Sequence, residues 1–117
     1  MWFGVALLGG LGALLRFFVD AVIGSRVGRD LPYGTLIVNL TGAVVLGFLT
    51  GLTVSGDLAV LAGTAAVGSY TTFSTWMLES HRLVEAGELR NATRNITLSI
   101  ALGLGAAALG RTLGAHW

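Results

Sequence analysis

At its centre the chain reads Gly68-Ser69-Tyr70-Thr71-Thr72-Phe73-Ser74-Thr75-Trp76, nine consecutive positions without an aliphatic side chain. These residues lie within an uncharged run that extends from Leu58 to Leu78. At about 1.5 Å per helical residue, Gly68 lies roughly 15 Å from Leu58, which is half the thickness of a bilayer's hydrocarbon core. A glycine followed by hydroxyl side chains at that depth predicts a membrane-spanning helix that is interrupted at its middle. The alternative is a continuous helix whose hydroxyl groups bond to their own backbone carbonyls.

The composition of the whole chain is that of a membrane protein. Hydrophobic residues make up 54% of its 117 residues and charged residues 11%, whereas a soluble domain carries about 25% charged residues. A soluble protein of this size needs more polar surface, so a soluble enzyme is excluded. The formal net charge of +1 argues against nucleic acid as a partner. Because the chain has no cysteine, disulfides and thiolate metal sites are excluded as well.

Four long apolar runs predict four transmembrane helices joined by short connections. A helix needs about 20 apolar residues to cross the hydrocarbon core. We place the spans at about 2–23, 33–53, 58–80 and 95–114. They use nearly the whole chain, so the predicted fold is an all-α membrane protein with a single four-span domain.

The arginines predict how the chain is oriented in the membrane. Four spans place both termini on one side, and the first and third loops on the other. Five arginines lie on the loop side, outside the spans: Arg26, Arg29, Arg82, Arg90 and Arg94. Arg111, near the end of the fourth span, is on the terminal side. By the positive-inside rule, the loops are expected to face the cytoplasm.

Small residues recur four positions apart in the predicted spans, which lets helix backbones approach closely in lipid. The pairs are Gly9/Ala13, Gly47/Gly51, Ala65/Ser69 and Gly110/Gly114. They are typical either of tight packing within one four-helix bundle or of contacts between subunits. We expect an oligomer, because four short helices enclose little of a pathway on their own.

Polar side chains in the second and fourth spans are candidates to line such a pathway. Thr35 and Asn39 are four residues apart and therefore project from one helix face. An asparagine in hydrocarbon must find partners, at a helix interface or in a wet pathway. Its NH₂ group can donate to an anion without introducing a net charge, and Ser99 can do so from the fourth span.

Aromatic and charged residues add further candidates. Phe73 and Trp76 share a helix face, and their ring edges carry a positive partial charge that can contact an anion; the alternative is a pair that faces lipid or the protein core. Arg16 and Asp20, four residues apart in the first span, are either functional or a structural ion pair. Glu79 lies near the loop-side end of the third span. Ser74 and Thr75 supply hydroxyl donors beside the two rings.

Together these residues resemble the fluoride channels of the Fluc/CrcB type. The resemblance covers essentially the whole chain, and its third-span motif is specific. The matching stretches are Gly9-Gly10-Leu11-Gly12-Ala13 followed by Arg16, Gly34-Thr35-Leu36-Ile37-Val38-Asn39 with Gly42, and Gly68-x-x-Thr71-Thr72-Phe73-Ser74-Thr75 with Glu79.

The resemblance implies an antiparallel dimer of four-helix subunits, with the third helix broken at mid-membrane and two pores along the interface. It implies a structural Na⁺ at that interface, held by the backbone carbonyls of Gly68 and Thr71 from both subunits. It also implies a fluoride pathway along Asn39, Phe73, Ser74, Thr75 and Trp76, with Thr35 and Glu79 in the vestibule and Arg16 on the first helix.

Two positions depart from the family pattern. Trp76 stands where the family usually has Phe, and adds an N–H donor to the aromatic ring. The tyrosine that the family often carries early in the fourth span is not evident near Ile96. Thr97 and Ser99 are both candidates to line the pathway from this span.

The resemblance implies passive fluoride export across the cell membrane, which lowers fluoride toxicity in the cytoplasm, and no enzymatic activity. One alternative is a small multidrug-type transporter, which needs a membrane-embedded acid, for which Asp20 is the candidate. Another is a non-conducting membrane assembly subunit. The arginine bias predicts that the chain inserts in one fixed orientation in membrane lipid. Its antiparallel partner would then be an oppositely oriented paralogue; the alternative is a second copy of the chain.

Overall fold

The structure is a computed structural model that describes residues 1–27 and 32–117. Within these residues the chain is all helical and has no strand, as the sequence predicts. The elements are α1 (Trp2–Val27), α2 (Tyr33–Gly51), α3 (Gly56–Leu58), the π-helix η1 (Ala59–Val67), α4 (Gly68–Tyr70), α5 (Ser74–Glu85) and α6 (Leu89–Ala115).

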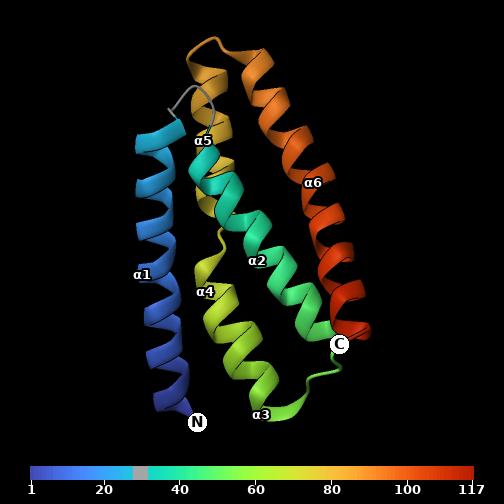
Figure 1. Cartoon of the computed structure of the whole chain (residues 1–117). Coiled ribbons are helices and arrows are strands. Elements are labelled where there is room, and N and C mark those ends of the chain that lie inside the picture. The colour runs from blue at the N-terminus through green and yellow to red at the C-terminus, as the bar shows by residue number, and fades with distance from the viewer. Residues whose placement is uncertain (28–31) are drawn as a thin grey trace.

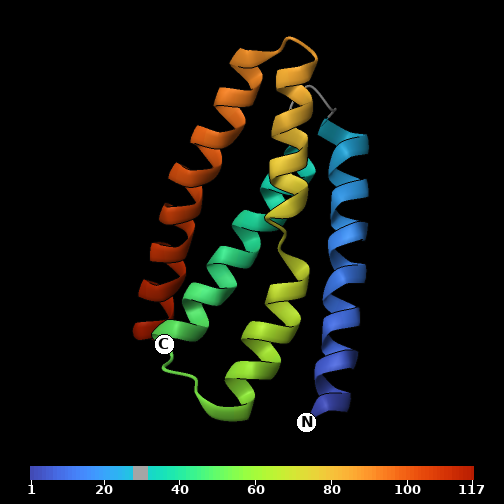
Figure 2. The ribbon, with the colours of Figure 1, turned by 180° about the vertical axis from the view of Figure 1, so that it is seen from behind.

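The helices lie side by side and run along the long axis of the molecule (Figures 1 and 2). The molecule extends 46 Å along this axis, more than the roughly 30 Å of a hydrocarbon core. Both termini and α3 lie at one end, and the turn between α5 and α6 lies at the other. The predicted first connection, 24–31, begins later than expected because α1 continues to Val27; residues 28–31, which include Arg29, lie outside the described residues.

Three helices of the described chain are long and apolar enough to cross a membrane: α1, α2 and α6. The segment predicted as the third span is divided into α3, η1, α4 and α5 instead. Residues 71–73, called the 71–73 segment below, belong to no helix, and Thr71 has extended backbone angles (φ −80°, ψ 162°). The chain therefore leaves helical geometry between α4 and α5 and resumes it at Ser74.

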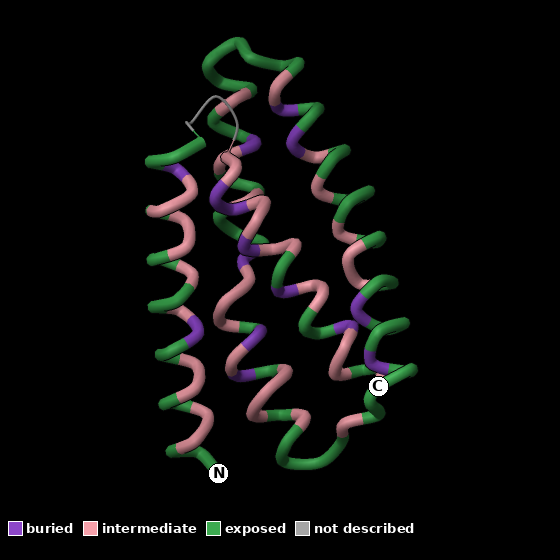
Figure 3. Tube along the Cα trace, viewed as in Figure 1, coloured by how far each residue is buried: buried purple, intermediate pink, exposed green. Residues whose placement is uncertain are grey.

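Apolar side chains cover the outside of the molecule, and buried positions lie mainly where helices meet (Figure 3). On α1, Trp2 is 84% exposed and Phe17 is 76% exposed. Among the described residues, Val38 on α2 is the one large side chain that is fully buried. So much exposed apolar surface is stable only against lipid or another protein surface, which agrees with a membrane location.

Glycines allow α2 and α6 to pack at close range. A Cβ added at Gly47 or Gly51 on α2 would lie within 2.3 Å of a backbone carbonyl oxygen on α6. A Cβ at Gly110 or Gly114 on α6 would lie equally close to a carbonyl oxygen on α2. The contact is reciprocal, which confirms that these two predicted pairs of small residues serve close helix packing.

Candidate functional site

Asn39 on α2 holds the backbone of the 71–73 segment. Its Nδ2 donates to the Thr72 carbonyl oxygen at 2.9 Å, and its Oδ1 accepts from the Thr72 N–H at 2.8 Å. In a continuous helix both backbone groups would bond along the third segment itself. Because an unsatisfied backbone group in hydrocarbon costs several kcal/mol, roughly the cost of a lost hydrogen bond there, this amide makes the non-helical backbone tolerable.

Two further α2 side chains, one on either side of Asn39, contact the third segment, which is the name used below for residues 56–85 (α3 to α5). The Thr41 Oγ1 lies 2.8 Å from the Tyr70 hydroxyl on α4, within hydrogen-bond distance. The Thr35 Oγ1 donates to Glu79 Oε1 on α5. α2 therefore contacts the chain before, within and after the 71–73 segment. The family resemblance implies that Thr35 and Glu79 both lie in the vestibule, and the structure brings these two side chains together.

Threonines of the 71–73 segment complete the ends of the adjoining helices. The Thr71 Oγ1 donates to the Val67 carbonyl oxygen at 3.1 Å. The Thr72 Oγ1 accepts from the Thr75 N–H at 3.2 Å and so caps the first turn of α5. Gly42 gives this segment its space, since a Cβ there would lie 2.1 Å from the Thr71 Cγ2. The local sequence thus satisfies most of the polar groups that the missing helical turn leaves open.

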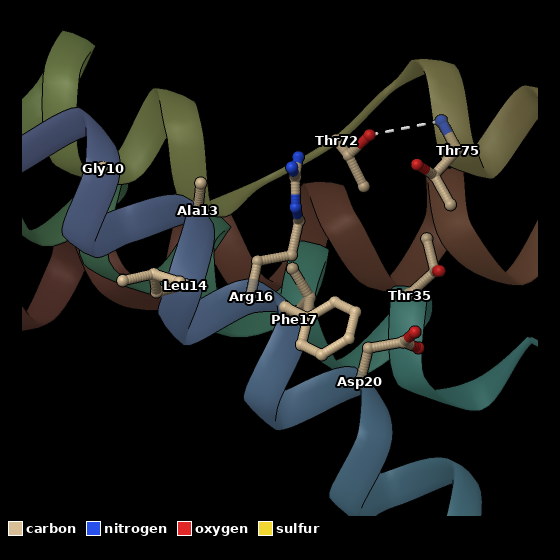
Figure 4. A pocket seen from close by; sticks show the side chains of 10 residues that line it. Gly10, Ala13, Leu14, Arg16, Phe17, Asp20, Thr35, Thr72 and Thr75 are labelled. Carbon is tan, nitrogen blue, oxygen red and sulfur yellow. Dashed lines mark hydrogen bonds between the residues drawn. The ribbon is translucent and has the colours of Figure 1, made fainter.

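Arg16 and Asp20 point to different parts of the molecule (Figure 4). Arg16 extends from α1 towards the 71–73 segment, where its Nη1 lies 3.5 Å from the Thr71 carbonyl oxygen. Asp20 lies against the first turn of α2, where a Cβ on Gly34 would meet its Oδ1 at 1.9 Å. In the part of the chain that the structure describes, the two residues form no ion pair with each other. The structural-pair interpretation is therefore wrong, because each side chain lies against another element.

Two pockets lie between the 71–73 segment and the end of the molecule that carries the turn between α5 and α6. The first has a volume of about 620 Å³ and is lined by polar groups from three helices and the segment. These are Arg16, Asp20, Thr35, Thr72 and Thr75. The second, of about 320 Å³, shares Asp20 with the first and contains Glu79, Arg82 and Glu88. Each pocket is lined by both basic and acidic side chains, so neither pocket carries charge of one sign only.

A third pocket carries the aromatic pair. It has a volume of about 340 Å³ and is lined by Asn39, Gly68, Phe73 and Trp76, among others. The two rings pack edge to face, with centroids 5.3 Å apart and an interplanar angle of 63°. The expected common face of Phe73 and Trp76 is therefore confirmed. In this arrangement the edge of one ring, which carries positive partial charge, meets the face of the other.

Some predicted residues lie outside these clusters. Ser74 is exposed at the first position of α5 and is absent from the lining of all three pockets. Ser99 lies on α6, and its Oγ is buried without a hydrogen-bond partner in the described chain. The indole Nε1 of Trp76 is buried and unpartnered in the same way within residues 1–27 and 32–117.

A buried polar pair joins α5 to α6 and was not anticipated from the sequence. Ser80 is 2% exposed and Asn95 is 4% exposed. The Asn95 Nδ2 donates to the Ser80 Oγ at 2.8 Å, and the Ser80 Oγ donates to the Trp76 carbonyl oxygen at 2.9 Å. The sequence does show an asparagine, Asn95, at the start of an apolar run. Its partner Ser80 becomes evident only when α5 and α6 are paired in the structure.

Known proteins resemble the chain along nearly all of its length. Residues 3–111 match the family model described as "CrcB-like protein, Camphor Resistance (CrcB)". "Fluoride-specific ion channel FluC 2" of Mycolicibacterium paratuberculosis is 57% identical over 113 residues, which are 97% of this chain and 93% of that protein. The protein of the same name from Mycobacterium tuberculosis strain H37Rv is 56% identical over 95% of this chain and 88% of its own length. "Fluoride-specific ion channel FluC 1" of Symbiobacterium thermophilum is 42% identical over 97% of this chain and 96% of its own length.

Proposed function

The chain belongs to the CrcB family, and on that premise we propose that it is a fluoride-specific ion channel of the bacterial cell membrane. It is a multi-pass membrane protein and not an enzyme. Passive export through such a channel lowers the fluoride concentration of the cytoplasm. Neither a multidrug-type transporter nor a non-conducting assembly subunit agrees with this family.

The observation that carries the proposal is the set of neutral donors and ring edges around the 71–73 segment. Fluoride leaves water only where other dipoles replace its hydration shell. The Asn39 amide has a second N–H beyond the one bonded to Thr72, and Asn39, Phe73 and Trp76 line the same pocket. Fixed neutral dipoles stabilise an anion without binding it so tightly that it cannot leave.

We infer that α3, η1, α4 and α5 together form the third of four crossings, broken at the 71–73 segment. Irregular backbone at membrane depth is tolerated only where it is buried in protein or lines a cavity. Thr72 is 9% exposed, its backbone bonds to Asn39, and it lines the pockets on both sides. These features support a broken helix rather than two separate short helices.

We infer that two such subunits pair in antiparallel orientation around a structural Na⁺. Gly68 and Thr71 offer backbone oxygen, the ligand that hard cations prefer. The Thr71 oxygen lies 3.5 Å from Arg16 Nη1, and it would exchange this long contact for the cation. The α-helical partner of the Gly68 carbonyl would be the Thr72 N–H, which bonds to Asn39 instead. One subunit offers few such oxygens, so carbonyls from a partner are needed to complete the site. The Na⁺ would supply a fixed positive charge between the two subunits.

Reconstitution tests the channel proposal directly. Liposomes that hold the purified chain should release fluoride down its gradient and retain chloride, as read by ion-selective electrodes. The Phe73→Ile variant should conduct several-fold less, because it replaces the ring edge by an aliphatic side chain. Phe18→Ile is the matched control, since Phe18 lies on α1 and is 65% exposed. Equal release of both halides, or a wild-type rate in Phe73→Ile, would contradict the proposal.

A further inference from the structure

The outward face of α6 carries two arginines in its first two turns. Arg90 and Arg94 are four residues apart, so both project from the same face of the helix, and both are exposed. Within the described chain, α6 packs against α2 and α5 alone, and it lies at one edge of the molecule (Figures 1 and 2). Its buried residues in these turns, Ala92 and Asn95, lie on the inward side. The two arginines therefore face away from the rest of the subunit.

Neither arginine forms an ion pair in the part of the chain that the structure describes. The two carboxylates nearest to them in the sequence bond elsewhere. Glu85 pairs with His81 at 2.7 Å, and Glu88 accepts from the Asn91 amide at 3.2 Å. α6 itself contains no acidic residue. Among residues 1–27 and 32–117, two positive charges on one helix face are thus left without a negative partner.

Helix stability does not account for these charges. The helix dipole places partial positive charge at the first turn of a helix, where acidic residues are favourable and basic residues are not. Arg90 lies in that turn of α6, which has no acidic residue, and the Glu88 side chain forms no capping hydrogen bond. The arginines therefore add to the positive potential at the start of α6, and this potential attracts an anion.

The surface of α6 becomes apolar directly beyond the arginines. No charged residue occurs from Asn95 to Gly110. Leu98 lies one turn beyond Arg94 and is 40% exposed, and Leu104 is 70% exposed. At about 1.5 Å per residue, Arg94 and Leu104 lie roughly 15 Å apart along the helix axis, which is half the thickness of the hydrocarbon core. The arginines thus stand at the edge of the hydrocarbon region, next to exposed apolar side chains.

We propose that Arg90 and Arg94 bind the phosphate group of an anionic phospholipid whose acyl chains lie along the apolar surface of α6. Guanidinium groups form bidentate hydrogen bonds with phosphate oxygens. A free phosphate ion would use the arginines alone, whereas a phospholipid also covers Leu98 and Leu104. A headgroup with net negative charge matches the two arginines, and the choline cation of phosphatidylcholine cancels that charge. The site is separate from the fluoride pathway and does not depend on conduction.

Native mass spectrometry of the purified chain in detergent tests the site, because it reads lipid binding without the effect of the arginines on membrane insertion. Phosphatidylglycerol should stay bound in preference to phosphatidylcholine with the same acyl chains. Arg90→Gln/Arg94→Gln should weaken phosphatidylglycerol binding roughly thirtyfold, at about fivefold for each arginine. The matched control is Arg26→Gln/Arg82→Gln, which removes the same charge from exposed positions in the last turns of α1 and α5.

Thermal unfolding in detergent is the second readout. Without lipid, both double variants should unfold near the wild-type temperature, because all four guanidinium groups are exposed. Phosphatidylglycerol should raise the unfolding temperature of the wild type and of the control, and leave that of Arg90→Gln/Arg94→Gln unchanged. Equal lipid binding by the two double variants would overturn the site, and so would an equal rise with inorganic phosphate. If Arg90→Gln/Arg94→Gln instead changes the number of chains in the native mass, this face is a subunit contact and the proposal is wrong.

Discussion

Asn39 contacts the backbone of Thr72 with both ends of its amide, so one side chain replaces two hydrogen bonds of a continuous helix. The sequence identifies Asn39 as a polar residue in hydrocarbon and predicts that it donates to an anion. It cannot show that the first partner is a backbone group 33 positions away. That pairing depends on how α2 lies against the 71–73 segment, which is a property of the packed molecule.

The Asn39→Asp variant should lose fluoride conduction and stability together. The carboxylate keeps an acceptor for the Thr72 N–H, but it cannot donate to the Thr72 carbonyl and places negative charge beside it. We expect the free energy of unfolding in detergent to fall by about 1–3 kcal/mol, the cost of an unsatisfied buried polar group. Fluoride release should fall to background, because a fixed negative charge repels the anion.

The matched control is Asn91→Asp, which makes the same chemical change in the first turn of α6, where the amide is half-buried and bonds to the Glu88 side chain alone among the described residues. Its conduction and unfolding temperature should stay close to wild type. Unchanged fluoride release in Asn39→Asp would remove Asn39 from the pathway. Lost release with unchanged stability would show that the bonds to Thr72 contribute little to the fold.

At the level of elements, hydropathy locates the helices but not their ends. The predicted first span stops at 23, whereas α1 continues through Ser25 and Arg26 to Val27. The predicted fourth span starts at 95, whereas α6 starts at Leu89. Polar residues extend both helices beyond the apolar run, because a helix continues into the interface as long as no residue stops it. The π-helix η1 is beyond prediction as well, since all its residues except Thr64 are apolar or glycine and give no periodic pattern.

The C-terminus of α2 carries a correctable strain. Thr53 has φ +58°, and the Val54 N–H bonds to the Leu49 carbonyl oxygen at 3.2 Å, as in a Schellman motif. A β-branched residue is unfavourable in this left-handed conformation. Thr53→Gly should therefore stabilise the protein by about 0.5–1 kcal/mol, measured as a higher unfolding temperature in detergent.

The end of α5 supplies the reverse experiment. Gly87 has φ +78° in the same motif, and a Cβ there meets nothing within 4 Å. Gly87→Thr should destabilise the protein by about 1 kcal/mol through backbone strain alone. Opposite shifts in the two variants would support the strain argument, and shifts of the same sign would refute it.

The glycines between α2 and α6 yield a sharper prediction. A Cβ at Gly110 would lie 2.0 Å from the Val44 carbonyl oxygen, and backbone on that side cannot move away without separating the helices. Gly110→Ala should destabilise the protein by about 2 kcal/mol or more. Gly103→Ala, on the same helix with nothing within 4 Å of the new Cβ, should be neutral or stabilising. Equal unfolding temperatures for the two variants would contradict the close-packing role of Gly110.

For the whole molecule, charge and topology together predict the orientation in the membrane. Figure 1 places both chain ends opposite the turn between α5 and α6. Arg82 lies in the last turn of α5, and Arg90 and Arg94 lie near the start of α6, whereas Arg111 lies near the end of α6. The arginine bias is a sequence property and could be read without a structure. Which copy or paralogue would complete the proposed dimer is not encoded in any single residue, because it depends on the partner's surface.

Cysteine labelling should show a single orientation. The chain has no native cysteine, so Glu88→Cys reports the loop side and Trp117→Cys reports the terminal side. In intact cells, a membrane-impermeant maleimide should label Trp117→Cys and spare Glu88→Cys, because the arginine-rich loops stay in the cytoplasm. Such a result requires an oppositely oriented paralogue for an antiparallel dimer. Partial labelling at both positions would instead support a dimer of identical chains.

The three contacts of α2 with the third segment, from Thr41, Asn39 and Thr35, also bear on biosynthesis. α2 precedes the third segment in the chain and so emerges first from the ribosome. The residues that stabilise the non-helical backbone are thus synthesised before that backbone. The chain thus makes α2 before the 71–73 segment whose backbone it bonds. A permuted chain in which α2 came last would have to insert those peptide groups before their hydrogen-bond partners were made.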